Sequence, residues 1–441
     1  MKLSIQKINR EIGALALPNV ISNVSTPLIS SVDTFLMGEI SPVTLAAVGV
    51  GSMVFNFLYW NMGFLRMGTT GLTAQAFGRK DAEEFTQVLF KAGALGLAIS
   101  LLFIILQKPL FDLAYWAMAS NSLEVTEVWK YFSIRIVAAP ASLLLMVMLG
   151  WLFGMQNARY PLFVTIFINS INILASFYLV RHLGYGVSGV AWGTVLAQYA
   201  GVGLCVLLIW MKYTGYFKQA KLSWKSITQN MGRLLHVNSD IFIRTLFLST
   251  VYVLIIRFSD GVGEHILAVN IVFMQFLHWM SYAIDGFAYA AESLVGKYKG
   301  ANNDNFIKLS IRWNLIWGLL FAILFTIVYA IFAEDIFTLF MESDPGGIVL
   351  NVAQEYMTWI VFVPLVGFAC YIWDGIFVGL TASSAMRNSM IIAFVIFLVS
   401  YYVLPSSWSN HRLWAAFYLF LISRALFQYL LYRKYGWQLI K

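Results

Sequence analysis

Long apolar stretches recur along the whole chain, and each is bounded by a short charged or Gly/Pro-rich segment. Most of them exceed the roughly 18 apolar residues that are typical of a helix crossing a bilayer. The pattern predicts twelve membrane-spanning helices in two sets of six. The first six are expected near 12–37, 43–77, 86–106, 128–153, 160–180 and 188–211. The second six are expected near 236–257, 264–295, 307–332, 353–380, 386–404 and 411–432.

The composition favours the same fold class, an all-α polytopic membrane protein that lies in the lipid bilayer. Hydrophobic residues make up 60% of the chain and charged residues 11%, whereas an ordinary soluble domain carries about 25% charged residues. Cys205 and Cys370 both lie inside apolar stretches, which argues against a disulfide framework or a thiol metal site. The first apolar stretch continues to Met37 without a cleavage motif, so we expect the first helix to stay in the mature protein.

The distribution of Lys and Arg predicts the orientation of the chain. Its net charge is +8, but the basic residues are scattered through the loops without a dense block, so we expect no nucleic-acid partner. Basic loops stay in the cytoplasm. The loops on the side of the N-terminus hold most of the basic residues, whereas the longest loop on the other side, 333–352, is acidic. We therefore expect both termini to be cytoplasmic.

A basic linker divides the predicted helices into two halves. The segment from Lys212 to Arg233 contains five basic residues and no acidic one. Residues 74–81 weakly resemble residues 296–303, 222 positions later, and residues 153–155 resemble 378–380. An even number of spans per half gives parallel repeats about an axis normal to the bilayer. We predict an N-terminal six-helix bundle over 1–212, a cytoplasmic linker over 213–235 and a pseudo-symmetric C-terminal six-helix bundle over 236–441.

Polar residues form stripes along several of the apolar helices. In the first span, the spacing places five of them within about 80° of one helix face. These are Asn19, Asn23, Thr26, Ser30 and Asp33. The fifth span carries Asn169, Asn172 and Ser176 at the same spacing, and the sixth carries Thr194 and Gln198. The pattern predicts a hydrated pocket among these three helices; helix–helix hydrogen bonding is the alternative for the small polar residues.

Asp33 is the ionisable member of the first stripe and has no basic residue within reach on its own helix. An ionisable side chain inside a membrane span indicates a proton or cation site. A carboxylate beside amide and hydroxyl oxygens can be protonated or can bind a hard cation such as Na⁺. The sequence leaves these two open. A solvated carboxylate at the membrane interface is the third interpretation.

A second group of charged and polar residues falls mostly in the C-terminal half. Asn270, His278, Asp285 and Glu292 share one face of the eighth span. Arg66, Asp240, Arg244 and Asp374 lie toward the cytoplasmic ends of other spans. We predict interhelical pairs that close an inner gate; fixed ion pairs without a gating role are the alternative.

The usual signatures of enzymes are absent from the sequence. There is no GxxxxGK[ST] phosphate-binding loop, HExxH zinc motif or G-x-S-x-G nucleophile elbow. We therefore expect no enzymatic activity, no cofactor and no firm metal site apart from a possible Na⁺ at Asp33. Any pumping would take its energy from an ion gradient.

Several segments resemble the DinF-like branch of the multidrug and toxic compound extrusion (MATE) family. They are FLRMGTTGLTAQAFG at 64–78, AVN at 268–270, YAIDGFAYA at 282–290, and Asp374-Gly375 with MRNSM at 386–390. The resemblance runs from the first span to the last. It implies two six-helix bundles in a V-shaped arrangement and export of cationic or amphipathic compounds, driven by inward flow of H⁺ or Na⁺.

The resemblance also implies a set of coupling residues. The family places an acidic residue on helix 1, an Asn and an Asp on helix 5 and a Thr on helix 6, and these positions correspond to Asp33, Asn172, Ser176 and Thr194. Ser176 departs from the family pattern, which usually has a second carboxylate there. One acid fewer lowers the negative charge available to a cation and removes a possible proton partner.

Our main hypothesis is a monomeric antiporter of a bacterial-type inner membrane, which exports organic cations in exchange for external H⁺ or Na⁺. One alternative is a flippase or exporter of a lipid-linked or other amphipathic metabolite, for which more cationic residues would be expected around the cavity. A non-transporting membrane sensor or scaffold is the alternative from another class.

Overall fold

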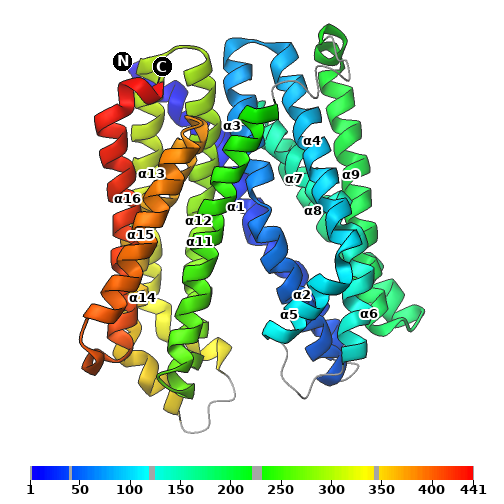
Figure 1. The fold of residues 1–441 in the computed structure, drawn as a ribbon, viewed down its shortest axis with the longest axis vertical. Helices are drawn as coiled ribbons and strands as arrows, with labels where there is room; N and C mark the ends of the chain where they lie inside the picture. The colour runs from blue at the N-terminus through cyan, green and yellow to red at the C-terminus, as the bar shows by residue number, and fades with distance from the viewer. Residues whose placement is uncertain (1, 39–41, 119–124, 221–230, 342–346, 441) are drawn as a thin grey trace. The chain divides into compact units, whose positions relative to one another are not determined.

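The computed structural model describes residues 2–38, 42–118, 125–220, 231–341 and 347–440. Within these ranges, the side chains of residues 2, 24–35, 37–38, 42–43, 117–118 and 437–440 lie outside the described part. All regular structure in the described ranges is helical (Figure 1). Eleven helical segments are long and apolar enough to cross a membrane, and the first predicted span falls on an additional helix, α1 (Lys2–Gly38). The predicted all-α polytopic fold is confirmed.

The described chain divides into two compact units. We call Ile21–Asn238 the N-terminal unit and Met1–Val20 with Ser239–Lys441 the C-terminal unit. The boundaries fall inside α1 and inside α11 (Met231–Asp260). The predicted domain boundaries at 212 and 236 remain a prediction. Between them, α9 continues through Gln219 and α11 begins at Met231, while 221–230 lie outside the described residues.

The described residues of the N-terminal unit form eight further helices. They are α2 (Pro42–Asn61), α3 (Phe64–Arg79), α4 (Ala82–Ile105), α5 (Gln107–Met118), α6 (Val125–Arg135), α7 (Ala139–Gly154), α8 (Arg159–Phe177) and α9 (Gly186–Gln219). A 3-10 turn, Ile136–Ala138, joins α6 to α7, and a π-helical turn, Tyr178–His182, follows α8. Helix α7 packs against α3 and α4, and α8 packs along α9.

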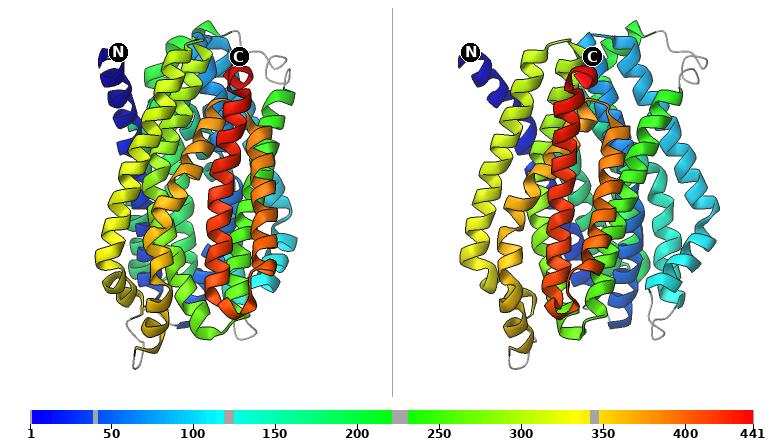
Figure 2. Two further views of the ribbon diagram at one scale, coloured as in Figure 1. Left: turned by 90° about the vertical axis from the view of Figure 1, so that its left-hand side faces the viewer. Right: turned by 60° about the vertical axis from the view of Figure 1, so that its left-hand side comes forward.

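The C-terminal unit contains five helices after α11. They are α12 (Glu264–Gly300), α13 (Asp304–Phe340), α14 (Ile348–Gly379), α15 (Ser383–Val403) and α16 (Asn410–Ile440), with a 3-10 turn at Ser406–Trp408. Helix α14 packs against α12, α13 and α16, and α15 lies beside α16 (Figure 2).

Two predicted spans of the N-terminal half are interrupted, and one helix was not predicted. The span expected at 43–77 breaks between α2 and α3, where Asn61 Nδ2 donates a 2.9 Å hydrogen bond to the Phe57 carbonyl and so competes with the backbone. The span at 128–153 changes to a 3-10 turn just before Pro140. Pro140 has no N–H to donate to the Ile136 carbonyl, which instead accepts from the Ala139 N–H. Helix α5 was missed because its twelve residues are too few to span a bilayer.

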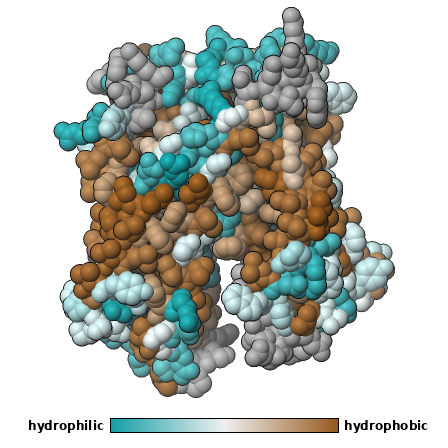
Figure 3. Space-filling view, in the orientation of Figure 1, coloured by the Kyte–Doolittle hydropathy of each residue, from teal (hydrophilic) through white to brown (hydrophobic). Residues whose placement is uncertain are grey.

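Apolar side chains cover the outer surface of the helices over their middle, and hydrophilic ones gather toward their ends (Figure 3). Ile105, Leu174 and Trp210 are each more than 60% exposed, as expected of side chains that face lipid. Inside the N-terminal unit, one apolar cluster surrounds Phe132 and another surrounds Trp151. The described surface therefore has the hydrophobic band that a bilayer requires.

The weak internal repeat corresponds to equal backbone geometry in the two units. Lys80 has φ 62° and is followed by Asp81, which caps α4 by accepting from Glu84 N. At a distance of 222 residues, Asn302 has φ 51° and is followed by Asn303, which caps α13 by accepting from Phe306 N. Each pair ends one helix in the left-handed region and begins the next with a side-chain cap.

A pair of glycines repeats in the same way. A Cβ on Gly150 of α7 would lie 2.5 Å from the Arg66 carbonyl oxygen of α3, and a Cβ on Gly375 of α14 would lie 2.2 Å from the Ala288 carbonyl oxygen of α12. Only glycine permits these backbones to approach so closely. The two units thus share one packing frame, α3 with α7 and α12 with α14.

Candidate functional site

The packing of α8 against α9 positions three of the predicted coupling residues in the N-terminal unit. A Cβ on Gly193 would lie 2.8 Å from the Ser176 backbone nitrogen, so the two helices touch at this level. Asn172 Nδ2 donates a 3.0 Å hydrogen bond to Thr194 Oγ1, which itself donates to the Val190 carbonyl at 3.2 Å. The structure therefore brings Asn172, Ser176 and Thr194 together in the interior of one unit.

Two oxygens of this group have no hydrogen-bond partner among the described residues. Asn172 is 1% exposed and Ser176 is 0% exposed, and neither Asn172 Oδ1 nor Ser176 Oγ is bonded. A buried polar atom without a partner costs roughly 1–3 kcal/mol, so such atoms are rare and need an explanation. An incoming proton donor or a hard cation would satisfy both oxygens.

The other residues of the predicted pocket belong to both units, and the side chains of some lie outside the described residues. Asn23, Asn169 and Gln198 are half-buried members of the N-terminal unit. Asn19 is buried, belongs to the C-terminal unit, and has an Nδ2 without a partner among the described side chains. The side chains of Thr26, Ser30 and Asp33 lie outside the described residues, although their backbone is part of α1.

The C-terminal unit contains a buried ionic network centred on Asp374 of α14. Asp374 Oδ2 accepts from Arg244 of α11 and, at 2.7 Å, from Arg424 Nη2 of α16. Asp374 Oδ1 accepts from Gln428 Nε2 at 2.6 Å. Both oxygens of the carboxylate are therefore occupied. Asp285 of α12, another predicted gate residue, is half-buried and interacts electrostatically with Arg244.

Arg424 is a member of this network that the sequence analysis missed. It is 0% exposed, and its guanidinium lies 5.3 Å from the centre of the Phe420 ring and 5.7 Å from that of Tyr371. Our predicted arginines, Arg66 and Arg244, both lie outside the last span. The signal was present, because an arginine in the middle of a membrane span is by default functional or paired.

Asp240 of α11 forms a second, separate cluster with the start of α15. Ser383 Oγ and Ser384 Oγ donate to Asp240 Oδ2 at 2.8 and 2.7 Å. Arg387 donates to Asp240 Oδ1. The predicted interhelical pairs thus exist for Asp240 and for Arg244 with Asp374, but in two clusters rather than one. Arg66 belongs to the N-terminal unit.

Asn270, in the polar stripe of α12, has a structural role. Asn270 is buried and donates to Ser259 Oγ at 2.6 Å and to Asn410 Oδ1 at 2.8 Å. Its own Oδ1 accepts from Asn410 and from Trp414 Nε1, so the amide is fully bonded. His278 is half-buried with its ring edge-on to that of Tyr252, and Glu292 is buried.

Fold and polar interior together define an integral membrane protein built from two related helical units, each with polar side chains at its centre. The chain matches the MatE family over residues 18–178 and 241–403. It therefore belongs to the MatE family of membrane transporters. The predicted family assignment is confirmed.

Individual relatives agree with this assignment. The chain is 36% identical to DNA damage-inducible protein F of Escherichia coli, over 93% of this chain and 89% of that protein. It is 24% identical to a probable multidrug resistance protein NorM of Thermotoga maritima, over 78% of this chain and 74% of that protein. A crystal structure of MATE in the bent conformation superposes with a TM-score of 0.86 at 18% identity, over 99% of this chain and 98% of that one.

Proposed function

We propose that the protein is a secondary antiporter that exports organic cations or amphipathic toxic compounds in exchange for H⁺ or Na⁺. Its family membership and its relatives, among them a probable multidrug resistance protein, support export. The observation that carries the coupling is the pair of buried, unbonded oxygens of Asn172 and Ser176. These two oxygens lie in the interior of the N-terminal unit, and no described side chain donates a hydrogen bond to them.

We assign the ion-coupling role to Asp33 together with Asn172, Ser176 and Thr194. All four positions belong to the N-terminal unit, and Asp33 is the acidic one among them. A protonated carboxyl is a donor that an unbonded amide oxygen accepts, and a bound Na⁺ is a cation that oxygens coordinate. Either event neutralises Asp33, and the transporter changes its conformational balance only as far as the two states differ in affinity for the ion.

The charged clusters of the C-terminal unit support export of cations over transport of a phosphorylated lipid. Arg244 and Arg424 are both bonded to Asp374, and Asp285 also acts on Arg244. Two buried positive charges thus share the Asp374 carboxylate. Because both arginines already pair with this carboxylate, a phosphate would have to compete with Asp374 for them.

A transport experiment tests the proposal. The protein and its Asp33→Asn variant are reconstituted into proteoliposomes, and uptake of a fluorescent organic cation is followed under a pH gradient and, separately, under a Na⁺ gradient. We expect the wild type to respond to one of the gradients and the variant to neither. Asp112→Asn, at an exposed position on α5, is the matched control and should transport normally.

Each other result has a definite meaning. Unchanged transport in Asp33→Asn would remove Asp33 from the mechanism. Absence of flux in the wild type under either gradient would favour the sensor or scaffold. Thermal stabilisation of the protein by lipid pyrophosphates, together with absence of cation flux, would favour the flippase. We further propose an inner-membrane location with both termini cytoplasmic, a monomeric state, and bundles bounded at 212 and 236.

A further inference from the structure

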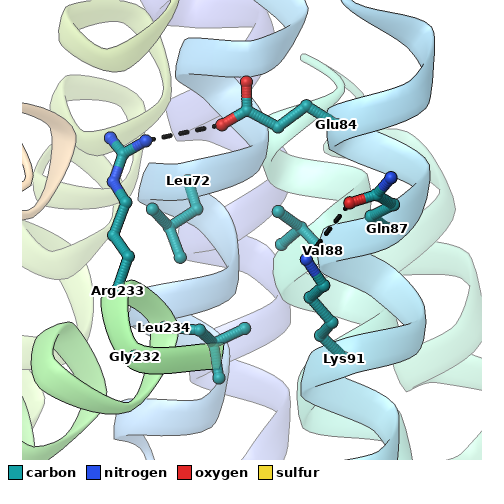
Figure 4. A pocket seen from close by; sticks show the side chains of 8 residues that line it. All are labelled: Leu72, Glu84, Gln87, Val88, Lys91, Gly232, Arg233 and Leu234. Atoms are coloured by element: carbon teal, nitrogen blue, oxygen red, sulfur yellow. Dashed lines mark hydrogen bonds and ion pairs between the residues drawn. The ribbon is translucent and has the colours of Figure 1, made fainter. Parts of the chain in front are cut away.

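The N-terminal unit holds a cavity that the proposed transport mechanism does not use. Its volume is about 520 Å³, and it lies between α3, α4 and the first turn of α11 (Figure 4). It is lined by Leu72, Glu84, Gln87, Val88, Lys91, Gly232, Arg233 and Leu234. The volume falls within the range of roughly 300–1,000 Å³ that is typical of small-ligand sites.

Lys91 is a buried cation in this cavity that forms no ion pair within 4.0 Å with a described residue, although Glu84 attracts it electrostatically from farther away. The residue is 7% exposed, and its Nζ donates a 3.1 Å hydrogen bond to the neutral Gln87 Oε1. Gln87 is held in this orientation because its Nε2 donates to Glu83 Oε1 at 3.0 Å. An ammonium group has three donors, so the other two remain for a ligand.

The single acidic residue of the lining does not neutralise Lys91. Glu84 Oε2 pairs with Arg79, and Glu84 Oε1 lies 3.4 Å from Arg233 Nη1. Arg233 Nη2 also donates to Gln75 Oε1 at 3.2 Å. The lining thus contains two positive groups and one negative group, and both oxygens of the negative group are already engaged by arginines. Its electrostatic balance favours an anion.

The rest of the lining is apolar. Leu72, Val88 and Leu234 project between the two basic side chains in Figure 4. A free inorganic anion would leave this surface unused, whereas an acyl chain or another apolar body would cover it. The combination of an unpaired ammonium, an arginine and an apolar wall matches an anionic headgroup attached to an apolar body.

We propose that this cavity binds a phosphate group, with Lys91 and Arg233 as its ligands. Arg233 is in the first turn of α11, whose residues up to Asn238 belong to the N-terminal unit while the rest of the helix belongs to the C-terminal unit. A phosphate held by both side chains joins the beginning of α11 to α4. The site is therefore placed to regulate α11, one of the two helices whose residues are divided between the units.

Binding to the full-length protein in neutral detergent tests the proposal with three probes. Dioctanoyl phosphatidic acid carries the phosphate on an apolar body, dioctanoylglycerol has the same chains without phosphate, and inorganic phosphate is the free anion. We expect the phosphatidic acid to bind and dioctanoylglycerol not to bind at the same concentration, as measured by titration calorimetry. If inorganic phosphate competes with the phosphatidic acid, the natural ligand is a soluble phosphate. If it does not compete, the natural ligand is a lipid headgroup.

Variants locate the site. Lys91→Gln and Arg233→Gln should each weaken the Kd for phosphatidic acid about tenfold, because each removes a charge-assisted hydrogen bond. Lys91→Arg keeps the charge and should bind within about threefold of the wild type, which separates loss of a ligand from misfolding. Lys308→Gln, at an exposed lysine of α13, is the matched control and should bind normally.

The proposal is overturned by any of three results. These are equal binding of dioctanoylglycerol, no binding of either phosphate probe, and unchanged affinity in both Lys91→Gln and Arg233→Gln. None of the residues involved belongs to the proposed coupling site, so failure of this site would leave the antiport proposal standing.

Discussion

The two units share a packing frame but differ in how one central polar group of each is bonded. Gly150 and Gly375 make equivalent close approaches to a neighbouring helix. Beside this frame, the N-terminal unit holds Asn172 and Ser176, each with an unbonded oxygen among the described residues. The C-terminal unit holds Asp374, whose two oxygens accept three hydrogen bonds from side chains.

This difference separates two uses of buried polarity in a membrane protein. A carboxylate whose two oxygens already accept from guanidinium and amide donors has little capacity left for a further ligand. Unbonded neutral oxygens, by contrast, cost free energy until a ligand arrives. The repeated packing frame thus holds two unbonded oxygens in the N-terminal unit and a fully bonded carboxylate in the C-terminal unit.

Removing the charge of Asp374 from its ionic network should have the largest effect on stability. In Asp374→Asn, an amide nitrogen would replace one acceptor oxygen, and Arg244 and Arg424 would lose their shared counter-charge. Removing one partner of a buried ionic network costs about 3–5 kcal/mol. We expect a loss of that size in the free energy of unfolding, measured by denaturant titration in mild detergent.

The control for this prediction is an exposed acid in the same unit. Asp260 pairs with Arg257 at 3.1 Å, and both side chains are more than half exposed. Asp260→Asn should therefore cost no more than about 1 kcal/mol. Equal losses of unfolding free energy in the two variants would show that the Asp374 network does not stabilise the C-terminal unit.

The shared frame should respond equally in both units. Gly150→Ala and Gly375→Ala each place a Cβ against a backbone carbonyl of the facing helix, and we expect each to lower the free energy of unfolding by about 1–3 kcal/mol. Gly203→Ala on α9, where no atom lies within 4 Å of the new Cβ, should cause no loss. A large effect in only one unit would argue against an equivalent frame.

The sequence predicted the fold well because the bilayer makes its pattern simple. Every spanning helix must bury its backbone hydrogen bonds and expose apolar side chains, so length and hydropathy located the spans. The break before Pro140 and the short helix α5 were missed because they depend on local backbone geometry and not on hydropathy. The repeat at 74–81 and 296–303 was detectable because both segments end a helix with one left-handed residue and a cap.

The candidate sites were predicted less completely. Spacing identified Asn172, Ser176 and Thr194 as one face, and the structure places them together at the α8–α9 contact. Spacing within one helix cannot tell which partner on another helix a charge will meet. The Asp374 and Asp240 clusters, the role of Arg424 and the cavity beside Lys91 therefore needed coordinates. For Asp33 the coupling role remains a proposal.

The hydrogen bond between Asn172 and Thr194 should contribute less than the ionic network. A double-mutant cycle with Asn172→Ala and Thr194→Val isolates their interaction. Hydrogen bonds between membrane helices average about 0.6 kcal/mol and reach about 1.7 kcal/mol, so we expect a coupling energy in this range from the four unfolding curves. A coupling energy indistinguishable from zero would show that the two side chains act independently.

The smallest effect is expected where a buried hydroxyl has no partner. Ser176→Ala removes an unbonded group, so its free energy of unfolding should stay equal to that of the wild type or rise by up to about 1 kcal/mol. Ser259 is equally buried but accepts a hydrogen bond from Asn270 at 2.6 Å, so Ser259→Ala should cost about 1 kcal/mol. An equal loss in both variants would mean that Ser176 is already bonded, and the contrast between the unbonded Ser176 hydroxyl and the fully bonded Asp374 carboxylate would not hold.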